Sequence, residues 1–414
     1  MGPVLVTESQ PQEWTYVSEG GATIVFSYTG PSHPNFTGKV LRLRKIPVSK
    51  AAPMTHTDDD EPDDPMIAFQ RIVIAPLVPS EYLPDLDVVL LDASWLGALE
   101  NLRNVDRPAE RREKDQIDKG RRKGILATDL VGGKGTLAVE IKPKWGFMPN
   151  PIHLSQETAP LKTTTCRFCM HTLFKSEGGD VSTQYCPLDL YSRDEGRMRR
   201  AVHDLWSGWV QSDGELNNLR LFVSGKMIKP SEQSFTALKE FLPGNPVLEE
   251  AFSAALLPFL RRPALAVISN LQSALDALDI EGLAKLYAMV HPDADGLNCV
   301  DWDPSFEEWQ EFATSYDSVY CTLDHSKLFP EHIKTYLMAY LLSASFKDCS
   351  VIFRIRRPDA SGQPSVDAPH AITVIDLDMK RVDRLGKWAD LDRRIVEHCQ
   401  TIDAIQRKPC VERH

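Results

Sequence analysis

Residues 136–148 read TLAVEIKPKWGFM, an apolar run that passes into a charged segment and ends at aromatic residues and a glycine. The run TLAVEI predicts a buried strand, because it is short and rich in apolar residues. Side chains alternate along a strand, so we expect Lys142 and Lys144 to leave the backbone on the same side. Two neighbouring ammonium groups repel unless an anion lies between them. The stretch therefore predicts a polyanion site at the end of a strand.

The composition is that of a soluble globular protein, with 42% hydrophobic and 25% charged residues among 414. This length suffices for two lobes around a cleft. No apolar run approaches a membrane-spanning length, and the N-terminal residues lack the pattern of a signal peptide. The eight cysteines show no disulfide-like framework, which favours a reducing compartment. We therefore expect a monomer in the cytoplasm or the nucleus, with no membrane partner.

The charge is distributed unevenly along the chain. A net charge of −11 argues against a nucleic-acid-binding protein, since such proteins are usually basic. Acidic residues concentrate at 56–65, whereas basic residues concentrate at 107–124 and 354–357. An acidic protein with focused basic clusters suits a compact, highly charged anion.

The order of elements predicts an α+β chain with two lobes. Strand-like runs at 14–28, 38–45, 71–78 and 87–93 give a β-rich N-terminal lobe, residues 1–148. Within it, we expect a disordered insertion at 46–66 and a mobile basic loop at 103–124. Helical patterns dominate residues 149–414, with a break at Pro263 and strands near 351–357 and 371–380.

A basic stripe occurs in RFCMHTLFK, where Arg167, His171 and Lys175 recur at helical spacing. Such stripes are most often solvated faces. Within this stripe, however, no acidic residue lies at a spacing that allows an ion pair, so a bound anion would neutralise its charge. Cys166 and Cys169 form a C-x-x-C with no second pair nearby, which gives little support for a zinc site.

Two acidic motifs are candidates for catalysis. In VIDLDMK, strand alternation would place Asp376 and Asp378 on one side, where they suit Mg²⁺ beside nucleotide phosphates. The same Asp-x-Asp pattern also occurs in plain turns. In KDCS, Asp348 is either part of a turn or a general base that Lys347 keeps ionised.

Two further segments carry weaker signals. Gly20 and Gly21 permit a turn over phosphates with Arg42 on the next strand, although a plain hairpin turn explains them as well. In NNLR, Asn217 and Arg220 offer polar groups at the start of a strand, and Asn–Asn is also a turn signal.

Taken in order, these segments resemble the inositol-pentakisphosphate 2-kinase family. EIKPKWGF is similar to the family signature EIKPK-x-GF, and RFCMH-x-x-x-K, PLDLYS, NNLR, KDCS and IDLD-x-K follow in the family's order. The resemblance spans residues 14 to about 388. It implies a two-lobed, protein-kinase-like fold with an enlarged helical C-lobe. The implied activity is transfer of the ATP γ-phosphate to the 2-hydroxyl of inositol 1,3,4,5,6-pentakisphosphate, which gives inositol hexakisphosphate (phytate).

The resemblance also implies roles for individual residues. Asp348 would be the general base, assisted by Lys142, and Asp376 with Asp378 would hold Mg²⁺. The residues implied to bind ATP are Gly20, Gly21, Arg42, Glu140, Lys142 and Asp376. Those implied to bind substrate phosphates are Arg111 (with Arg107 or Arg112 as alternatives), Lys144, Arg167, His171, Lys175, Asn217, Arg220, Lys380 and Arg384.

The chain departs from the family pattern at a few positions. Trp388 stands where some relatives have a substrate-contacting tyrosine, and it cannot donate a phenolic hydrogen bond. Some relatives hold a structural zinc through two histidines and a C-x-x-C in the helical region. That region contains no C-x-x-C here, although it holds His291, Cys299, Cys321 and His325.

Two alternatives to the kinase stay open. One is a non-catalytic inositol-polyphosphate-binding protein, and the other is a kinase for a less phosphorylated inositol. The presence of both Asp348 and Asp376 favours an enzyme.

Overall fold

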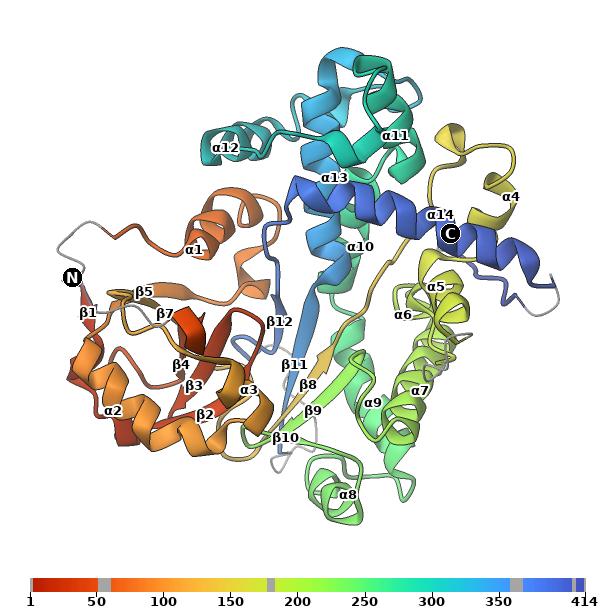
Figure 1. Ribbon diagram of the computed structural model, residues 1–414. Coiled ribbons are helices and arrows are strands. Elements are labelled where there is room, and N and C mark those ends of the chain that lie inside the picture. The colour runs from red at the N-terminus through yellow and green to blue at the C-terminus, as the bar shows by residue number, and fades with distance from the viewer. Residues whose placement is uncertain (1–2, 51–60, 177–182, 358–367, 404–406, 413–414) are drawn as a thin grey trace. The chain divides into compact units, whose positions relative to one another are not determined.

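The computed structural model describes residues 3–50, 61–176, 183–357, 368–403 and 407–412. The chain divides into two compact units. The first comprises Met1–Ala68, Pro84–Ala138 and Phe222–Met227, and the second comprises Phe69–Leu83, Val139–Leu221 and Ile228–His414. Two sheets and many helices make the chain α+β, as predicted (Figure 1).

The first unit is built on a seven-stranded sheet in the order β1-β5-β7-β4-β3-β2, and β6 pairs with β4. Neighbouring strands from β2 to β5 run antiparallel, and β1 lies parallel to β5. The predicted hairpin at 14–28 and the strand at 38–45 are confirmed. The strands are β1 Val4–Leu5, β2 Trp14–Glu19, β3 Thr23–Tyr28, β4 Lys39–Pro47, β5 Leu86–Leu90, β6 Asp115–Ile117 and β7 Lys123–Thr128.

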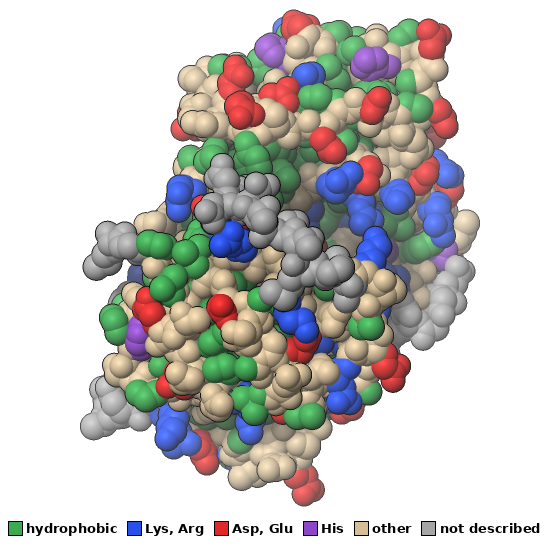
Figure 2. Space-filling model, turned by 60° about the vertical axis from the view of Figure 1, so that its left-hand side comes forward, with side chains coloured by type: hydrophobic (Ala, Val, Ile, Leu, Met, Phe, Trp, Pro, Cys, Tyr) green, Lys and Arg blue, Asp and Glu red, His purple; other side chains and the backbone are tan. Residues whose placement is uncertain are grey.

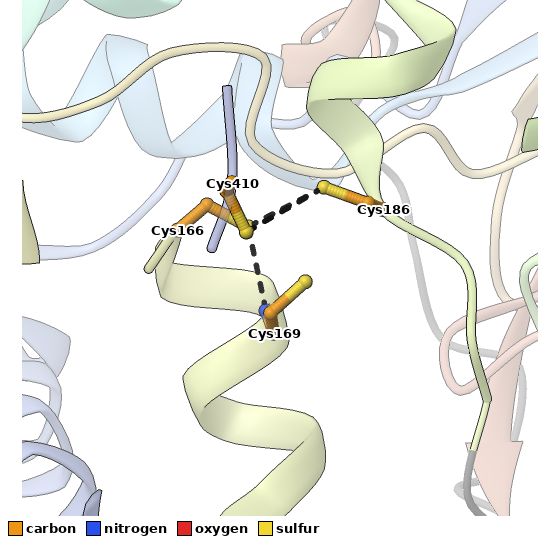
Figure 3. Close-up of side chains that lie close together, drawn as sticks. All are labelled: Cys166, Cys169, Cys186 and Cys410. Atoms are coloured by element: carbon orange, nitrogen blue, oxygen red, sulfur yellow. Dashed lines mark hydrogen bonds between the residues drawn. The ribbon is translucent and has the colours of Figure 1, made fainter. Parts of the chain in front are cut away.

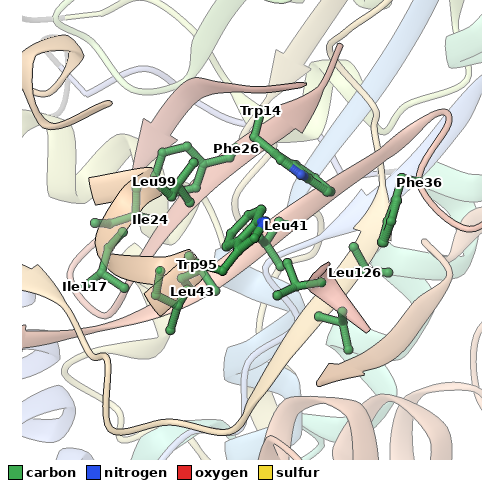
Figure 4. Packing of buried hydrophobic residues seen from close by; sticks show 13 residues of the cluster. Trp14, Ile24, Phe26, Phe36, Leu41, Leu43, Trp95, Leu99, Ile117 and Leu126 are labelled. Atoms are coloured by element: carbon green, nitrogen blue, oxygen red, sulfur yellow. The ribbon is translucent and has the colours of Figure 1, made fainter. Parts of the chain in front are cut away.

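Helix α2, Ala93–Arg103, covers the core face of this sheet (Figure 4). Along β4, Leu41 and Leu43 are buried while Arg42 and Arg44 point to the other face, because strand side chains alternate. Trp95 of α2 enters the same core and donates from Nε1 to the Ser9 carbonyl at 2.8 Å. Each such apolar side chain contributes roughly 1.5–3 kcal/mol when it is buried. The alternation visible in the sequence therefore positions this sheet.

Two predictions for this part of the chain are wrong. The run at 71–78 is not a strand, because α1 (Pro65–Phe69) continues into a π-helical turn, Gln70–Ile74, and residues 75–78 form a turn. A short apolar run does not by itself distinguish a buried helical turn from a strand. The basic segment 103–124 is not a loop, since it forms α3 (Ala109–Lys114), β6 and the start of β7.

The predicted disordered insertion at 46–66 is described only in part. Residues 51–60 lie outside the described residues. On their C-terminal side, Glu61, Asp63 and Asp64 pair with Arg121, Lys123 and Arg44, respectively. The acidic end of this segment is therefore tied to basic residues of the first unit.

The second sheet has five strands in the order β10-β9-β8-β11-β12. Its central strand β8, Thr136–Ile141, is buried along its whole length, as its apolar run predicts. The other strands are β9 Leu219–Val223, β10 Lys226–Ile228, β11 Ser350–Arg356 and β12 Ile372–Ile375. The strands β8, β11 and β12 all end or begin beside residues that the sequence marks as functional.

Helices make up most of the second unit (Figure 1). The predicted break at Pro263 is confirmed, because Pro263 is the first residue of α10, where its missing N–H costs little. Helix α13 packs on α10, and α14 packs on α5. The helices are α4 Ala159–Lys162, α5 Arg167–Ser176, α6 Pro187–Leu190, α7 Glu195–Gln211, α8 Glu232–Lys239, α9 Leu248–Leu260, α10 Pro263–Leu275, α11 Asp279–Val290, α12 Phe306–Ser315, α13 Ile333–Asp348 and α14 Leu385–Thr401.

Within the described ranges, no single helix is long and apolar enough to cross a membrane. One bent pair, α9 with α10–α11, passes that test by length and composition alone.

Candidate functional site

A cavity of about 690 Å³ lies in the second unit, within the size range of small-molecule sites. More basic side chains than carboxylates line it, and the carboxylates are those of Asp348, Asp378 and Asp392. The basic or potentially basic side chains in the lining are Lys144, Arg167, His171, Lys175, Lys347, Lys380, Arg381 and Arg384. Lys and Arg side chains also gather in places on the face shown in Figure 2, in keeping with the uneven charge of the sequence. An excess of cations in a cavity of this size favours a polyanionic ligand.

Helix α5 carries the predicted basic stripe into this cavity. Arg167, His171 and Lys175 all line it, while Leu173 and Phe174 pack toward α14. Arg167 donates from Nε to Asp392 Oδ1 at 2.7 Å, and its guanidinium lies 5.7 Å from the centre of the Trp145 ring. The stripe is therefore a cavity wall and not a solvated face.

His171 is uncharged at neutral pH in this setting. Burial and the neighbouring charges of Arg167, Lys175 and Lys144 together lower its pKa to about 4. An anion placed among these groups would reverse the charge effect, because it stabilises the protonated imidazole. The site can therefore gain positive charge as a ligand binds.

Asp348, the last residue of α13, lies between two lysines of the cavity. Its Oδ1 is 3.1 Å from Lys144 Nζ and its Oδ2 is 3.4 Å from Lys380 Nζ. Burial disfavours its ionisation, but the ammonium groups of Lys144, Lys380 and Lys142 outweigh burial and hold the pKa below its usual value. Asp348 is therefore an ionised carboxylate, which is the state that a general base requires.

The suggestion that Lys347 keeps Asp348 ionised is wrong. Lys347 turns into the core and pairs with Asp276 Oδ2 at 2.6 Å, and both side chains are almost fully buried. Its ammonium also lies 4.1 Å from the centre of the Trp145 ring and 4.5 Å from that of Tyr340. Consecutive residues at the end of a helix point in different directions, so Lys347 supports the cavity wall while Asp348 faces the cavity.

Lys142 and Lys144 do meet at one place, but the predicted reason is wrong. Strand β8 ends at Ile141, and Lys144 has a left-handed backbone with φ 65°, so strand alternation does not apply to them. Lys142 Nζ lies 3.4 Å from both the Asp348 carbonyl and Asp376 Oδ2. Carboxylates of the chain itself therefore lie beside these lysines, where an anion was expected.

A second acidic group surrounds Ser350, the first residue of β11. Ser350 Oγ lies 2.8 Å from Glu140 Oε1 and 3.3 Å from Asp376 Oδ2. Burial raises the pKa of Glu140, and the nearby charge of Asp376 adds to that effect. Two carboxylates around one hydroxyl are the oxygen donors that Mg²⁺ prefers, so this donor set fits a divalent cation.

Strand alternation again does not explain the aspartates of IDLD. Strand β12 ends at Ile375, and Asp376 has a left-handed backbone with φ 61°. Asp378 lines the cavity, whereas Asp376 faces Ser350 and Lys142. The two carboxylates therefore border different parts of the site.

The remaining predicted residues fall into three groups. Asn217 and Arg384 line the cavity. Arg220 does not, and its Nη1 instead lies 4.0 Å from Glu140 Oε2. The residues that belong to the first unit are Gly20, Gly21, Arg42 and Arg111.

Arg107 is excluded as an alternative to Arg111. It is 4% exposed and donates to Glu19 and to Asp115, so it has no freedom to reach a ligand. Arg111 and Arg112 lie on α3 and are half-buried.

Sequence reasoning missed Gln272, a buried residue in the apolar helix α10. Its Nε2 donates to the carbonyls of Lys144 and Phe346 at 2.9 Å each, and its Oε1 accepts from Gly146 N at 2.7 Å. It therefore joins the Lys144 turn to the end of α13. A polar residue within an otherwise apolar helical run was the available signal, since such residues need buried partners.

Asp392 and Gly146 were also missed. Asp392 binds Arg167 and Lys162, and so holds the start of α5. A side chain at Gly146 would come within 2.6 Å of the Tyr191 ring. The Tyr191 ring therefore leaves no room for a side chain at position 146.

Comparison with known proteins agrees with the site. The sequence profile described as inositol-pentakisphosphate 2-kinase matches residues 16–394. A protein of that name from Cryptococcus neoformans is 33% identical over 402 residues, covering 94% of this chain and 93% of the relative. Proteins of that name from Arabidopsis thaliana and Danio rerio are each 25% identical, over 95% and 93% of this chain and 94% and 92% of their own lengths. The chain therefore belongs to the inositol-pentakisphosphate 2-kinase family and is a kinase.

Proposed function

We propose that this protein transfers the γ-phosphate of ATP to the 2-hydroxyl of inositol 1,3,4,5,6-pentakisphosphate, giving inositol hexakisphosphate. The observation that carries the proposal is the cation-rich cavity with the ionised carboxylate of Asp348 in its lining. Membership of the family, and the names of relatives from fungi, plants and a vertebrate, support the same reaction.

The substrate phosphates would be held by the cavity cations. Lys175 and Arg384 have no ion-pair partner among the residues that the structure describes, so they are free to bind phosphate. The guanidinium of Arg384 suits a bidentate grip on a phosphate better than an ammonium group does. Lys144, Arg167, His171, Asn217 and Lys380 complete the proposed contacts.

Substrate binding would also activate Asp348. Lys144 and Lys380 contact this carboxylate, and substrate phosphates would compete for both ammonium groups. The competition would leave Asp348 less neutralised and raise its pKa toward a value better suited to accept the 2-hydroxyl proton. Lys142, which contacts Asp376 and the Asp348 carbonyl, would stabilise the negative charge of the transferred phosphoryl group.

For the nucleotide, we propose a site that includes Glu140, Lys142 and Asp376. Asp376 would hold Mg²⁺ with Glu140 nearby, since both carboxylates lie at Ser350, and Asp378 would contribute from the side of the cavity that it lines. The ion would neutralise charge on the ATP phosphates. As the family resemblance implies, we also propose that Gly20, Gly21 and Arg42 bind ATP and that Arg111 binds the inositide. We also propose that the protein is a monomer that works in the cytoplasm or the nucleus.

The test is to incubate the purified protein with Mg·ATP and inositol 1,3,4,5,6-pentakisphosphate and to separate the products by anion exchange. Formation of inositol hexakisphosphate is expected, with loss of activity when EDTA removes Mg²⁺. Phosphorylation of tetrakisphosphates in preference to the pentakisphosphate would favour a kinase for less phosphorylated inositols. Tight inositide binding by calorimetry without any product would favour a non-catalytic binding protein.

A further inference from the structure

Four cysteines from three distant segments meet beside α5. Cys166 and Cys169 lie at the start of this helix, Cys186 immediately precedes α6, and Cys410 lies near the C-terminus (Figure 3). All four Sγ atoms lie within 4.8 Å of one another. Cys410 is 224 residues beyond Cys186, so the arrangement exists only in the folded chain.

The sulfur separations suit a tetrahedral ion. Cys166 Sγ lies 4.0 Å from Cys186 Sγ, which in turn lies 3.8 Å from Cys410 Sγ. A zinc ion with Zn–S bonds of about 2.3 Å places its tetrahedral ligands roughly 3.8 Å apart. A disulfide requires about 2.05 Å, and all four cysteines are free thiols. The spacing therefore matches shared coordination and not a covalent pair.

The surroundings also resemble a structural metal site. The thiols of Cys166, Cys169 and Cys186 are buried among apolar neighbours that include Met148 and Leu188. Cys169 N donates to Cys166 Sγ at 3.5 Å, the backbone contact that stabilises a thiolate at the start of a helix. Four protein ligands leave no open position for substrate, which is the mark of a structural site.

The C-terminal segment is fixed where it supplies its ligand. Cys410 N donates to the Thr164 carbonyl at 2.8 Å, and Lys408 Nζ donates to the Gln184 carbonyl at 3.0 Å. Met148 N donates to Glu412 Oε1 at 2.7 Å. These bonds hold Cys410 against both other segments that contribute thiols.

We propose that Cys166, Cys169, Cys186 and Cys410 bind one structural Zn²⁺. Each cysteine would bind as a thiolate, so the four thiol protons pass to solvent and the occupied site carries a net charge of about −2. The ion would tie the C-terminal segment to the start of α5, the helix that presents Arg167, His171 and Lys175 to the cavity. The proposal does not depend on the proposed reaction.

This site differs from the one that the resemblance suggested. His291, Cys299, Cys321 and His325 form no group of converging ligands within the described part of the chain. The Cys299 carbonyl accepts from Tyr287, and His325 Nδ1 lies 3.1 Å from the Tyr336 hydroxyl. Cys166 and Cys169, a pair that gave little support for zinc in the sequence, instead lie together with Cys186 and Cys410.

The test is metal analysis of the full chain purified without chelators, together with Co²⁺ substitution. We expect close to one zinc per chain, and a sulfur-to-cobalt charge-transfer band with the intense d–d bands of a tetrahedral thiolate site. Replacement of one ligand should lower the zinc content more than about tenfold after dialysis at fixed free zinc. Cys410→Ser is the first variant, because Cys410 is the least buried of the four.

The matched control is Cys399→Ser. Cys399 is buried on α14 and donates to the Met170 carbonyl at 3.5 Å, a bond that serine can also make, and it lies outside the cluster. This variant should keep its zinc and its cobalt spectrum. If Cys410→Ser fails to fold, Cys186→Ser and a thiol titration of the native protein before and after zinc release provide the same test. Zinc-free protein after zinc loading, a disulfide within the cluster, or loss of zinc only from Cys321→Ser would each overturn the proposal.

Discussion

Two groups of basic residues, one in each unit, have opposite relations to acidic partners. In the first unit, Lys45 and Arg107 share Glu19 and Asp115, with four N–O distances between 2.7 and 3.0 Å. The side chains of Lys45, Arg107 and Glu19 are at most 2% exposed. The cavity of the second unit instead collects more cations than carboxylates.

The difference shows that local basic sequence does not decide whether a residue binds a ligand. Arg107 lies in the most basic segment of the chain, yet its guanidinium is paired with Glu19, which is distant in sequence, and with Asp115 of the same segment. Lys175 lies in a less basic segment and lines the cavity, with no ion-pair partner among the described residues. Charge balance after folding therefore separates structural cations from those available to an anion.

The largest expected effect concerns the carboxylate that separates the cavity cations. Asp348→Asn should lower kcat about 10²–10⁴-fold, because it removes the group that accepts the hydroxyl proton. Inositide affinity should be retained or increased, since Lys144 and Lys380 lose a competing carboxylate. Steady-state kinetics and calorimetry measure the two quantities separately.

The control for this variant is Asp390→Asn, an exposed carboxylate on α14 that lies 3.8 Å from Arg393. It should leave both kcat and affinity unchanged. A parallel loss of affinity and turnover in Asp348→Asn would show that Asp348 is structural and would remove it from the proposed chemistry.

The next prediction compares a cation paired with buried carboxylates, Arg107, with a cation of the cavity, Lys175. Arg107→Met should lower the free energy of unfolding by about 3–5 kcal/mol, because it leaves Glu19 and Asp115 buried with one cation. Lys175→Met should change it by less than about 0.5 kcal/mol in the absence of ligand. Urea denaturation measures both changes.

Inositide affinity should show the reverse order in these variants. Lys175→Met should weaken binding, whereas Arg107→Met, assayed where it is folded, should leave the affinity of the cavity nearly unchanged. Equal destabilisation by both substitutions would contradict the distinction between cations paired with buried carboxylates and cavity cations available to a ligand.

The same distinction explains which features the sequence could predict. The α5 stripe and Asp348 were found because their signals are local: helical spacing in one case and a short motif in the other. Burial of β8 followed from its apolar run. Of the two lysines of the predicted polyanion site, Lys144 lines the cavity and Lys142 does not. The turn and the left-handed backbone at Lys144 were not visible in the alternation pattern.

Features that depend on distant partners were beyond local patterns. Asp276 forms an ion pair with Lys347, Asp392 forms one with Arg167, and Cys410 completes the thiol cluster. Each of these contacts joins segments more than 70 residues apart, and spacing within one segment carries no information about them. The short helical turn at 70–74 was missed for a different reason, since short apolar runs fit strands and helices alike.

The smallest expected effect is a pH dependence of stability and of inositide binding, which should arise from His171 among the cavity cations. The pKa of His171 is about 4, against an ordinary value of 6.5. Between these values the unfolded chain binds a proton that the folded chain does not, so His171 makes stability fall as the pH decreases from 6.5 toward 4. Bound phosphates should raise the pKa of His171, because they offset the charges of Arg167, Lys175 and Lys144.

Inositide binding near pH 6 should therefore include uptake of a fraction of a proton by His171, and affinity should rise modestly as the pH falls. Calorimetry in buffers of different ionisation enthalpy measures the uptake. His171→Asn serves as the reference, because the protonation of the inositide itself is common to both proteins and cancels in the difference. Equal proton uptake by the two proteins would mean that phosphates do not approach His171, and the substrate would then lie nearer to Lys380 and Arg384 than to α5. A larger uptake by the wild-type protein would instead place a phosphate beside the middle of the stripe, between Arg167 and Lys175.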